Sequence, residues 1–194
     1  LDKECAMEHP GFFKIAGPFS LGDLLENAEA RPGPSVDSDL EICNVMPLDE
    51  AGASHVTFFN NPKYLKSYTS TRASACFVEE KYADRAPEGV TALVSDNPYR
   101  SFALSLAMFY PDAVRPKTIG SADEGFAGGI HRSAELEDNV TVEPGATVGP
   151  EARIGSGTVI AAGASIGYRV CIGRDCYIGP NSTVTHALLG DAVI

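Results

Sequence analysis

Residues 130–184 read IHRSAELEDNVTVEPGATVGPEARIGSGTVIAAGASIGYRVCIGRDCYIGPNSTV, and an aliphatic residue returns at every sixth position. The aliphatic positions are Ile130, Leu136, Val142, Val148, Ile154, Ile160, Ile166, Ile172, Ile178 and Val184. A small or β-branched residue stands four places after each of the first nine, and glycine directly follows five of them. The fixed phase of glycine and proline excludes a helix. A period of six predicts short strands separated by sharp turns.

Repeated strand–turn units predict a solenoid. We expect each aliphatic side chain to point inward beside the small residue, and the following glycine either to let the chain turn or to let backbones approach closely. Neighbouring coils then lie about 4.8 Å apart, at strand spacing. Three hexads per coil predict a triangular prism of about three coils. The next aliphatic–glycine pair, Leu189 and Gly190, follows Val184 after five residues instead of six, which predicts a bulge or a small protruding loop.

Charge and composition exclude several classes of protein. The 194 residues include 26 acidic and 15 basic side chains, and the net charge of −11 argues against binding to nucleic acid or to anionic membrane surfaces. The sequence has no apolar run of about 18 residues that would predict a membrane span, and the N-terminus lacks the layout of a signal peptide. The five scattered cysteines do not make a disulfide framework, so we expect a cytoplasmic protein.

The composition changes near residue 120. Every lysine precedes residue 118, whereas 12 of the 19 glycines follow residue 120. We expect a tag or disordered leader over residues 1–11, with Met7 as the natural start, and a small α/β domain over residues 12–110. A linker is predicted over residues 111–129, and the first coils of a β-helix over residues 130–194. Because Ile194 ends the chain in mid-coil, we expect a truncated β-helix that continues in the natural protein.

Alternating strand and helix patterns support the α/β domain. Apolar runs predict strands over residues 40–45, 55–59, 74–79 and 90–95. Ser20 is the expected cap of one helix. The Asn-Pro pairs at residues 61–62 and 97–98 each predict a further helix N-terminus, with asparagine as the cap and proline as the first helical residue.

Residues 57–64, TFFNNPKY, carry the candidate binding site. A strand leads here into a helix N-terminus, whose free N–H groups and dipole favour a carbonyl or a phosphate. Phe58 and Tyr64 are suited to flank a flat ring, and Asn61 to read its polar edge. The alternative is structural: Asn61 is only a helix cap, and the two aromatic side chains belong to the core.

Two motifs and the hexad register together resemble one family. The motif F-x-x-N-P-K-Y spans residues 58–64, N-P-Y spans residues 97–99, and the hexads follow. The combination is similar to the UDP-3-O-acylglucosamine N-acyltransferases of lipid A synthesis, within the hexapeptide-repeat acyltransferases. The resemblance implies a left-handed parallel β-helix and an N-terminal uridine-binding domain, in which Phe58, Asn61 and Tyr64 contact the uracil ring. It also implies a homotrimer with active sites between subunits.

The resemblance further implies the chemistry. In the family, a 3-hydroxyacyl chain moves from acyl carrier protein to the 2-amine of UDP-3-O-acylglucosamine, a histidine is the general base, and no metal or other cofactor is needed. That histidine lies in a later coil, in a motif like I-A-H-N. None of His9, His55, His131 and His186 matches the motif, so no catalytic residue is assigned and we expect the 194-residue chain to be inactive. His131 is expected at the surface and His186 in a surface loop.

Two other functions stay open: a non-catalytic UDP-sugar-binding or scaffold module, and another hexapeptide acyltransferase. A carbonic-anhydrase-like enzyme needs three zinc-binding histidines on adjacent coils, but only His131 and His186 lie in the repeat. Cys171 and Cys176 form C-x4-C, which supplies too few ligands for a metal, and Cys176 is expected in the core. We therefore predict no metal site.

Overall fold

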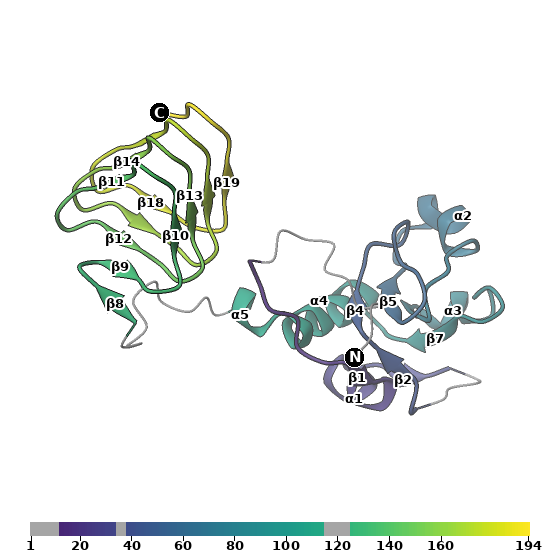
Figure 1. Cartoon of the computed structure of the whole chain (residues 1–194). Helices are drawn as coiled ribbons and strands as arrows, with labels where there is room; N and C mark the ends of the chain where they lie inside the picture. Colours follow the sequence, from purple (N-terminus) through teal and green to yellow (C-terminus); the bar gives the residue numbers. More distant parts are fainter. Residues whose placement is uncertain (1–11, 34–37, 115–124) are drawn as a thin grey trace. The chain divides into compact units, whose positions relative to one another are not determined.

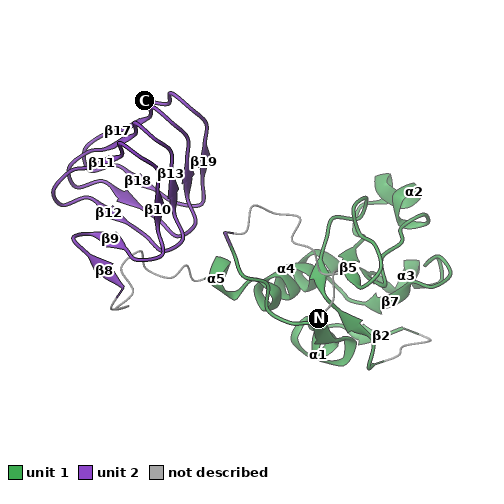
Figure 2. Ribbon diagram, in the orientation of Figure 1, with its two compact units in different colours: residues 1–6, 13–115 green, residues 7–12, 116–194 purple. Residues whose placement is uncertain are grey.

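The computed structural model of the protein describes residues 12–33, 38–114 and 125–194. The chain separates into two compact units, one containing residues 13–33 and 38–114 and the other residues 125–194 (Figures 1 and 2). The predicted leader over residues 1–11 and residues 115–124 of the predicted linker lie outside the described residues.

A five-stranded sheet forms the centre of the first unit. Its strand order is β2 (Arg31–Pro32), β7 (Thr91–Val94), β6 (Ala75–Val78), β5 (His55–Phe58) and β4 (Asn44–Val45). Strands β4 to β7 are parallel, and β2 pairs antiparallel with β7 at the edge. All residues of β6 are buried, as expected for a parallel strand covered on both faces.

Helices cover both faces of this sheet. They are α1 (Leu21–Asn27), η1 (Pro62–Tyr64), α2 (Leu65–Tyr68), α3 (Glu80–Ala83), α4 (Pro98–Phe109) and α5 (Pro111–Val114). Helices α1 and α4 share a core with Val56, Phe77 and Leu93. On the opposite face, Tyr68 of α2 stacks on Phe59 with ring centroids 4.7 Å apart, in a core that also includes side chains of α3. This unit has three layers, and its alternating strands and helices agree with the predicted small α/β domain.

Local signals explain most of these elements, with one exception. The Ser20 hydroxyl accepts a hydrogen bond from the Asp23 N–H (3.1 Å), and the Asp23 carboxylate accepts one from the Ser20 N–H (3.2 Å), so α1 begins with a capping box. The single strand predicted over residues 40–45 is wrong. Strand β3 (Glu41–Ile42) pairs antiparallel with β1 (Phe19–Ser20), whereas β4 pairs parallel with β5, because the chain passes from one sheet to the other at Cys43.

The second unit is a parallel β-helix built from two-residue strands. These strands are β8 (Phe126–Ala127), β9 (Ile130–His131), β10 (Glu135–Leu136), β11 (Thr141–Val142), β12 (Thr147–Val148), β13 (Arg153–Ile154), β14 (Val159–Ile160), β15 (Ser165–Ile166), β16 (Cys171–Ile172), β17 (Tyr177–Ile178), β18 (Thr183–Val184) and β19 (Leu188–Leu189). Every third strand joins the same sheet, giving the orders β10-β13-β16-β19, β11-β14-β17 and β18-β15-β12-β9-β8. Three hexads per coil are thereby confirmed. Strand β8 is the exception, since it pairs antiparallel with β9.

The inside of the prism holds the residues that the register assigned to it. Six consecutive aliphatic positions are buried: Val148, Ile154, Ile160, Ile166, Ile172 and Ile178. The small residues four places after an aliphatic are buried with them from Ala146 to Cys176, so Cys176 lies in the core as predicted. Thr158 is the polar member of this set. Its hydroxyl donates to the Gly173 carbonyl (2.8 Å) and accepts from the Cys176 N–H (3.0 Å).

The glycine that directly follows the aliphatic residue lets the backbones of neighbouring coils approach closely, but it is not the residue at which the chain turns. A Cβ atom on Gly155 would lie 2.6 Å from the Gly173 carbonyl carbon in the next coil, and one on Gly149 would lie 2.8 Å from the Ile166 oxygen. The turn falls two residues later, where φ is between 54° and 80°. The residues with this left-handed backbone are Asn139, Gly145, Glu151, Gly157, Gly163, Arg169, Asp175 and Asn181. Of the two roles predicted for the glycine, close approach is confirmed and turning is not.

The register slip after Val184 shortens a turn. Leu188 still pairs with Cys171, which is 17 positions earlier, whereas Cys171 pairs with Arg153, 18 positions earlier. His186 takes the left-handed corner with φ of 49°, five residues after Asn181. The predicted bulge or protruding loop is therefore wrong, because the corner loses one residue while the strands keep their pairing.

Two further expectations differ from the structure. His131 is buried, because β8 folds back on β9 and places the Phe126 ring edge-on to the imidazole with centroids 5.1 Å apart. The predicted linker over residues 111–129 includes α5 at its start and β8 near its end. Within the described ranges, no helix has both the length and the apolar character that a membrane span requires.

We expect Gly155→Ala to lower the free energy of unfolding of the β-helix unit by about 2–3 kcal/mol, because an added methyl group forces apart two backbones joined by hydrogen bonds such as Gly155 N–H to Ile172 O (2.8 Å). Gly179→Ala is the matched control, since its Cβ would meet the Ser182 hydroxyl at 3.6 Å, and we expect a change within about 0.5 kcal/mol. Chemical denaturation followed by circular dichroism measures both. Equal losses would show that close approach does not explain the glycine.

Candidate functional site

Phe58 ends strand β5, at the edge of the sheet where the carboxyl ends of the parallel strands lie. Ligands of open α/β sheets bind at this edge. The Phe58 side chain is half-buried, and its ring centroid lies 4.6 Å from that of Phe102 and 5.6 Å from that of Tyr99. Both partners belong to the first turns of α4. The site residue on β5 is therefore held from the side by a helix that begins 40 positions later.

Asn61 combines the two roles that the sequence left as alternatives. Its Oδ1 accepts a hydrogen bond from the Lys63 N–H (3.0 Å), so the residue caps η1 as predicted. The side chain is exposed, and its Nδ2 group donates to no residue in the described part of the chain. One end of the amide is thus committed to the helix, and the other is available to donate to a carbonyl oxygen of a ligand.

Tyr64 lies outside the core. It is 55% exposed, whereas Tyr68, one helical turn later, is fully buried against Phe59. No ring contact joins Tyr64 to Phe58 among the residues that the structure describes. The half-buried Phe58, at the end of β5, and the exposed Tyr64, at the end of η1, lie three positions before and three positions after Asn61 in the sequence.

The first turn of α4 is fixed by polar contacts. Asn97 caps the helix by accepting from the Arg100 N–H (3.0 Å), and the Asn97 N–H donates to the Ser95 hydroxyl (3.1 Å). The buried hydroxyls of Ser95 and Ser101 lie 2.7 Å apart. Arg100 makes a two-pronged ion pair with Glu29 (2.9 and 2.8 Å). Sequence reasoning assigned no role to α4 in the site, although the Asn-Pro pair at residues 97–98, which repeats that at residues 61–62, was a signal for it.

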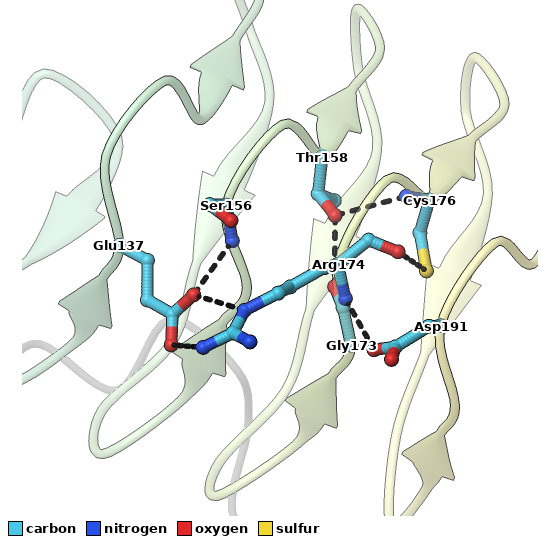
Figure 3. Close-up of polar contacts among 7 residues, drawn as sticks. All are labelled: Glu137, Ser156, Thr158, Gly173, Arg174, Cys176 and Asp191. Atoms are coloured by element: carbon cyan, nitrogen blue, oxygen red, sulfur yellow. Dashed lines mark hydrogen bonds and ion pairs between the residues drawn. The ribbon is translucent and has the colours of Figure 1, made fainter.

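A second surface lies on the β-helix, on the outer face of strands β10, β13, β16 and β19. A groove of about 600 Å³ on this face is lined by residues that include Glu137, Arg174 and Asp191. Figure 3 shows the polar contacts of these three residues. The Arg174 guanidinium donates hydrogen bonds to both carboxylate oxygens of Glu137 (2.8 and 3.1 Å), and the backbone N–H of Arg174 donates to the Asp191 carboxylate (2.8 Å). Arg174 thus links a carboxylate of the first coil to its own coil.

These contacts change the titration of Glu137. The hydrogen bond from Arg174, followed by that from the Ser156 N–H (3.0 Å), lowers the pKa of Glu137 from 4.5 to about 2. The carboxylate stays ionised and paired at neutral pH. Because Glu137 does not take up a proton near neutral pH, the Glu137–Arg174 pair is suited to a structural or a binding role rather than to acid–base catalysis.

No group of three or more His, Cys, Asp or Glu side chains within residues 12–33, 38–114 and 125–194 is arranged to hold a metal ion. Cys76 is buried, and burial raises the pKa of its thiol. Cys43 and Cys171 are half-buried, whereas Cys176, like Cys76, is buried.

Comparisons with known proteins match both units. Residues 39–108 match the family model described as UDP-3-O-(3-hydroxymyristoyl) glucosamine N-acyltransferase, LpxD. Residues 133–168 and 151–186 match the bacterial transferase hexapeptide model of six repeats. Hexapeptide repeats imply a left-handed β-helix, consistent with the three parallel sheets.

Curated relatives carry the name UDP-3-O-acylglucosamine N-acyltransferase. The protein of Rhodopseudomonas palustris (strain TIE-1) is 42% identical over 189 residues, which are 97% of this chain and 52% of that protein. That of Methylobacterium sp. (strain 4-46) is 44% identical over 132 residues, 68% of this chain and 38% of that protein. The chain spans about half the length of the curated relatives it matches, or less.

We expect Glu137→Gln to destabilise the β-helix unit at neutral pH and to have progressively less effect in acid. A carboxyl group with a lowered pKa stabilises the fold above its unfolded value near 4.5, and this contribution is lost as the pH falls through about 2. The difference in melting temperature between wild type and variant should therefore shrink between pH 5 and pH 3. Glu135→Gln, on the outer face of β10, is the control. A difference that stays constant with pH would contradict the role of the ionised pair.

Proposed function

Because the chain belongs, over residues 39–108 and its hexapeptide repeats, to the UDP-3-O-acylglucosamine N-acyltransferase family, we propose that its α/β unit binds the uridine part of UDP-3-O-acylglucosamine. Phe58 and Tyr64 are the proposed aromatic contacts of the uracil ring, and Asn61 the proposed hydrogen-bond donor to one of its carbonyl oxygens. We propose that the whole protein is a cytoplasmic homotrimer that assembles through its β-helices, with active sites between the subunits.

The proposed reaction of the whole protein is amide formation. The 2-amine of the sugar attacks the thioester carbonyl of a 3-hydroxyacyl chain on acyl carrier protein, so a C–N bond forms and the C–S bond breaks. A histidine general base takes the proton that the amine loses and passes it to the departing sulfur, so the carrier leaves as a thiol. Backbone or side-chain donors near the carbonyl would stabilise the oxyanion. No cofactor besides the thioester is needed for this exchange.

The free Nδ2 of Asn61 is the observation that carries the binding proposal. A residue needed only as a cap has its role fulfilled through Oδ1, yet this side chain is exposed and keeps a donor available, three positions before the exposed ring of Tyr64. Uracil has a carbonyl oxygen at C4, where cytosine has an amino group, and we assign the Asn61 donor to this oxygen. A donor at this position therefore favours uracil over cytosine.

Asn61→Asp separates base recognition from helix capping. Aspartate caps a helix as well as asparagine, so we expect the variant to remain folded. The carboxylate has no N–H to donate, so the preference for UMP over CMP should fall by at least about tenfold in calorimetric titrations. Asn97→Asp, at the other Asn-Pro cap, is the matched control. Repulsion between the added carboxylate and the phosphate weakens UMP and CMP binding alike, so it does not change the ratio of the two affinities. An unchanged ratio in Asn61→Asp would refute the assigned role.

Acyl transfer by the 194-residue chain is a separate test. None of its four histidines matches the family motif, so we expect UMP binding but no transfer from a 3-hydroxyacyl carrier protein to UDP-3-O-acylglucosamine above the uncatalysed rate. A radiolabelled acyl group measures the product directly. Transfer that is abolished by His131→Ala or His186→Ala would instead show that the general base is in this chain.

A further inference from the structure

Tyr99 is an exposed residue that nevertheless contacts the aromatic ring of Phe58 in the candidate site. Its side chain is 61% exposed, yet the ring meets Phe58 edge-on, with an interplanar angle of 66° and centroids 5.6 Å apart. Phe102, three positions later on the same helix, meets Phe58 at 4.6 Å and 38°. The two α4 rings therefore contact Phe58 at two different angles.

The turn that carries Tyr99 is the most heavily anchored part of α4. Asn97 is bonded to Ser95 and to the Arg100 N–H, Ser101 is bonded to Ser95, and Arg100 is paired with Glu29. Each contact joins the start of α4 to itself, to the end of β7 or to the end of α1. Rigid support of this kind holds a side chain in one position for a ligand.

We propose that Tyr99 is a positioning residue of the nucleotide site, which holds the Phe58 ring at the angle needed to stack on a pyrimidine. The inference rests on the proposed function, because Phe58 is the stacking residue only if the site binds uridine. An edge-on aromatic pair stabilises a fixed relative orientation of two rings. Without the Tyr99 ring, Phe58 keeps its contact with Phe102 but loses the edge-on contact with Tyr99. A stacked base would then have to order the Phe58 ring on binding.

The test compares two substitutions of Tyr99 in calorimetric titrations with UMP. We expect Tyr99→Leu to weaken UMP binding about three- to tenfold, and Tyr99→Phe to bind within about twofold of wild type, because it keeps the ring. Tyr177→Leu, at an exposed tyrosine of the β-helix unit, is the matched control and should leave binding unchanged. Melting curves should be the same for Tyr99→Leu and wild type, since the side chain is mostly exposed.

The outcomes separate this inference from the proposed function. Wild-type affinity in Tyr99→Leu, or equal losses in Tyr99→Leu and Tyr99→Phe, would overturn the positioning role and leave uridine binding intact. If the unmodified chain does not bind UMP, the proposed function fails first and the inference with it. A measurement independent of any variant uses nuclear magnetic resonance of the unmodified chain. UMP should shift the ring protons of Tyr99 but not those of Tyr177, and an unshifted Tyr99 would overturn the inference.

Discussion

Close stacking of successive coils is the constraint on which the β-helix unit depends. Backbone hydrogen bonds such as Arg153 N–H to Val170 O (2.9 Å) hold neighbouring coils at strand spacing. At that spacing there is little room for a side chain directly after most of the buried aliphatic residues, and glycine fills the position. Where the position is glutamate, at Glu137 and Glu143, the carboxylate accepts a backbone N–H of the next coil, from Ser156 (3.0 Å) and Ala162 (2.8 Å). The same stacking therefore determines both where glycine follows the aliphatic residue and what glutamate contacts when it takes that position.

The α/β unit uses a different principle to build its site. Residues from the end of β5 and from the start of α4 are distant in the sequence, but the parallel sheet brings the two segments together. An asparagine cap followed by proline starts the helical segment on each side, at Asn61 and at Asn97. Both caps use only the side-chain oxygen, so the capping contacts leave the amide nitrogen of each asparagine unused.

The sequence predicted the parts of the fold that follow from strict periodicity or from a local cap. The hexad register identified the buried positions, and Asn61 and Asn97 identified two helix starts. Contacts between distant segments left no such signal. The burial of His131 depends on β8 folding back, the break at Cys43 depends on two different partner sheets, and the contact of Tyr99 with Phe58 depends on the packing of α4. For the candidate site, the sequence predicted the residue types. Only the hydrogen-bond geometry shows that Asn61 caps the helix through Oδ1 and leaves Nδ2 as a donor.

The shortened corner at His186 shows how the solenoid absorbs a change in chain length. One residue is missing between Val184 and Leu189, yet Leu188 and Leu189 remain paired with Cys171 and Ile172. Because the corners face outward and tolerate side chains as different as those of Glu151, Arg169 and His186 in the left-handed backbone, deletions there leave the interior undisturbed. Evolution can therefore insert or remove residues at the corners, and so remodel the outer surface, without repacking the apolar interior.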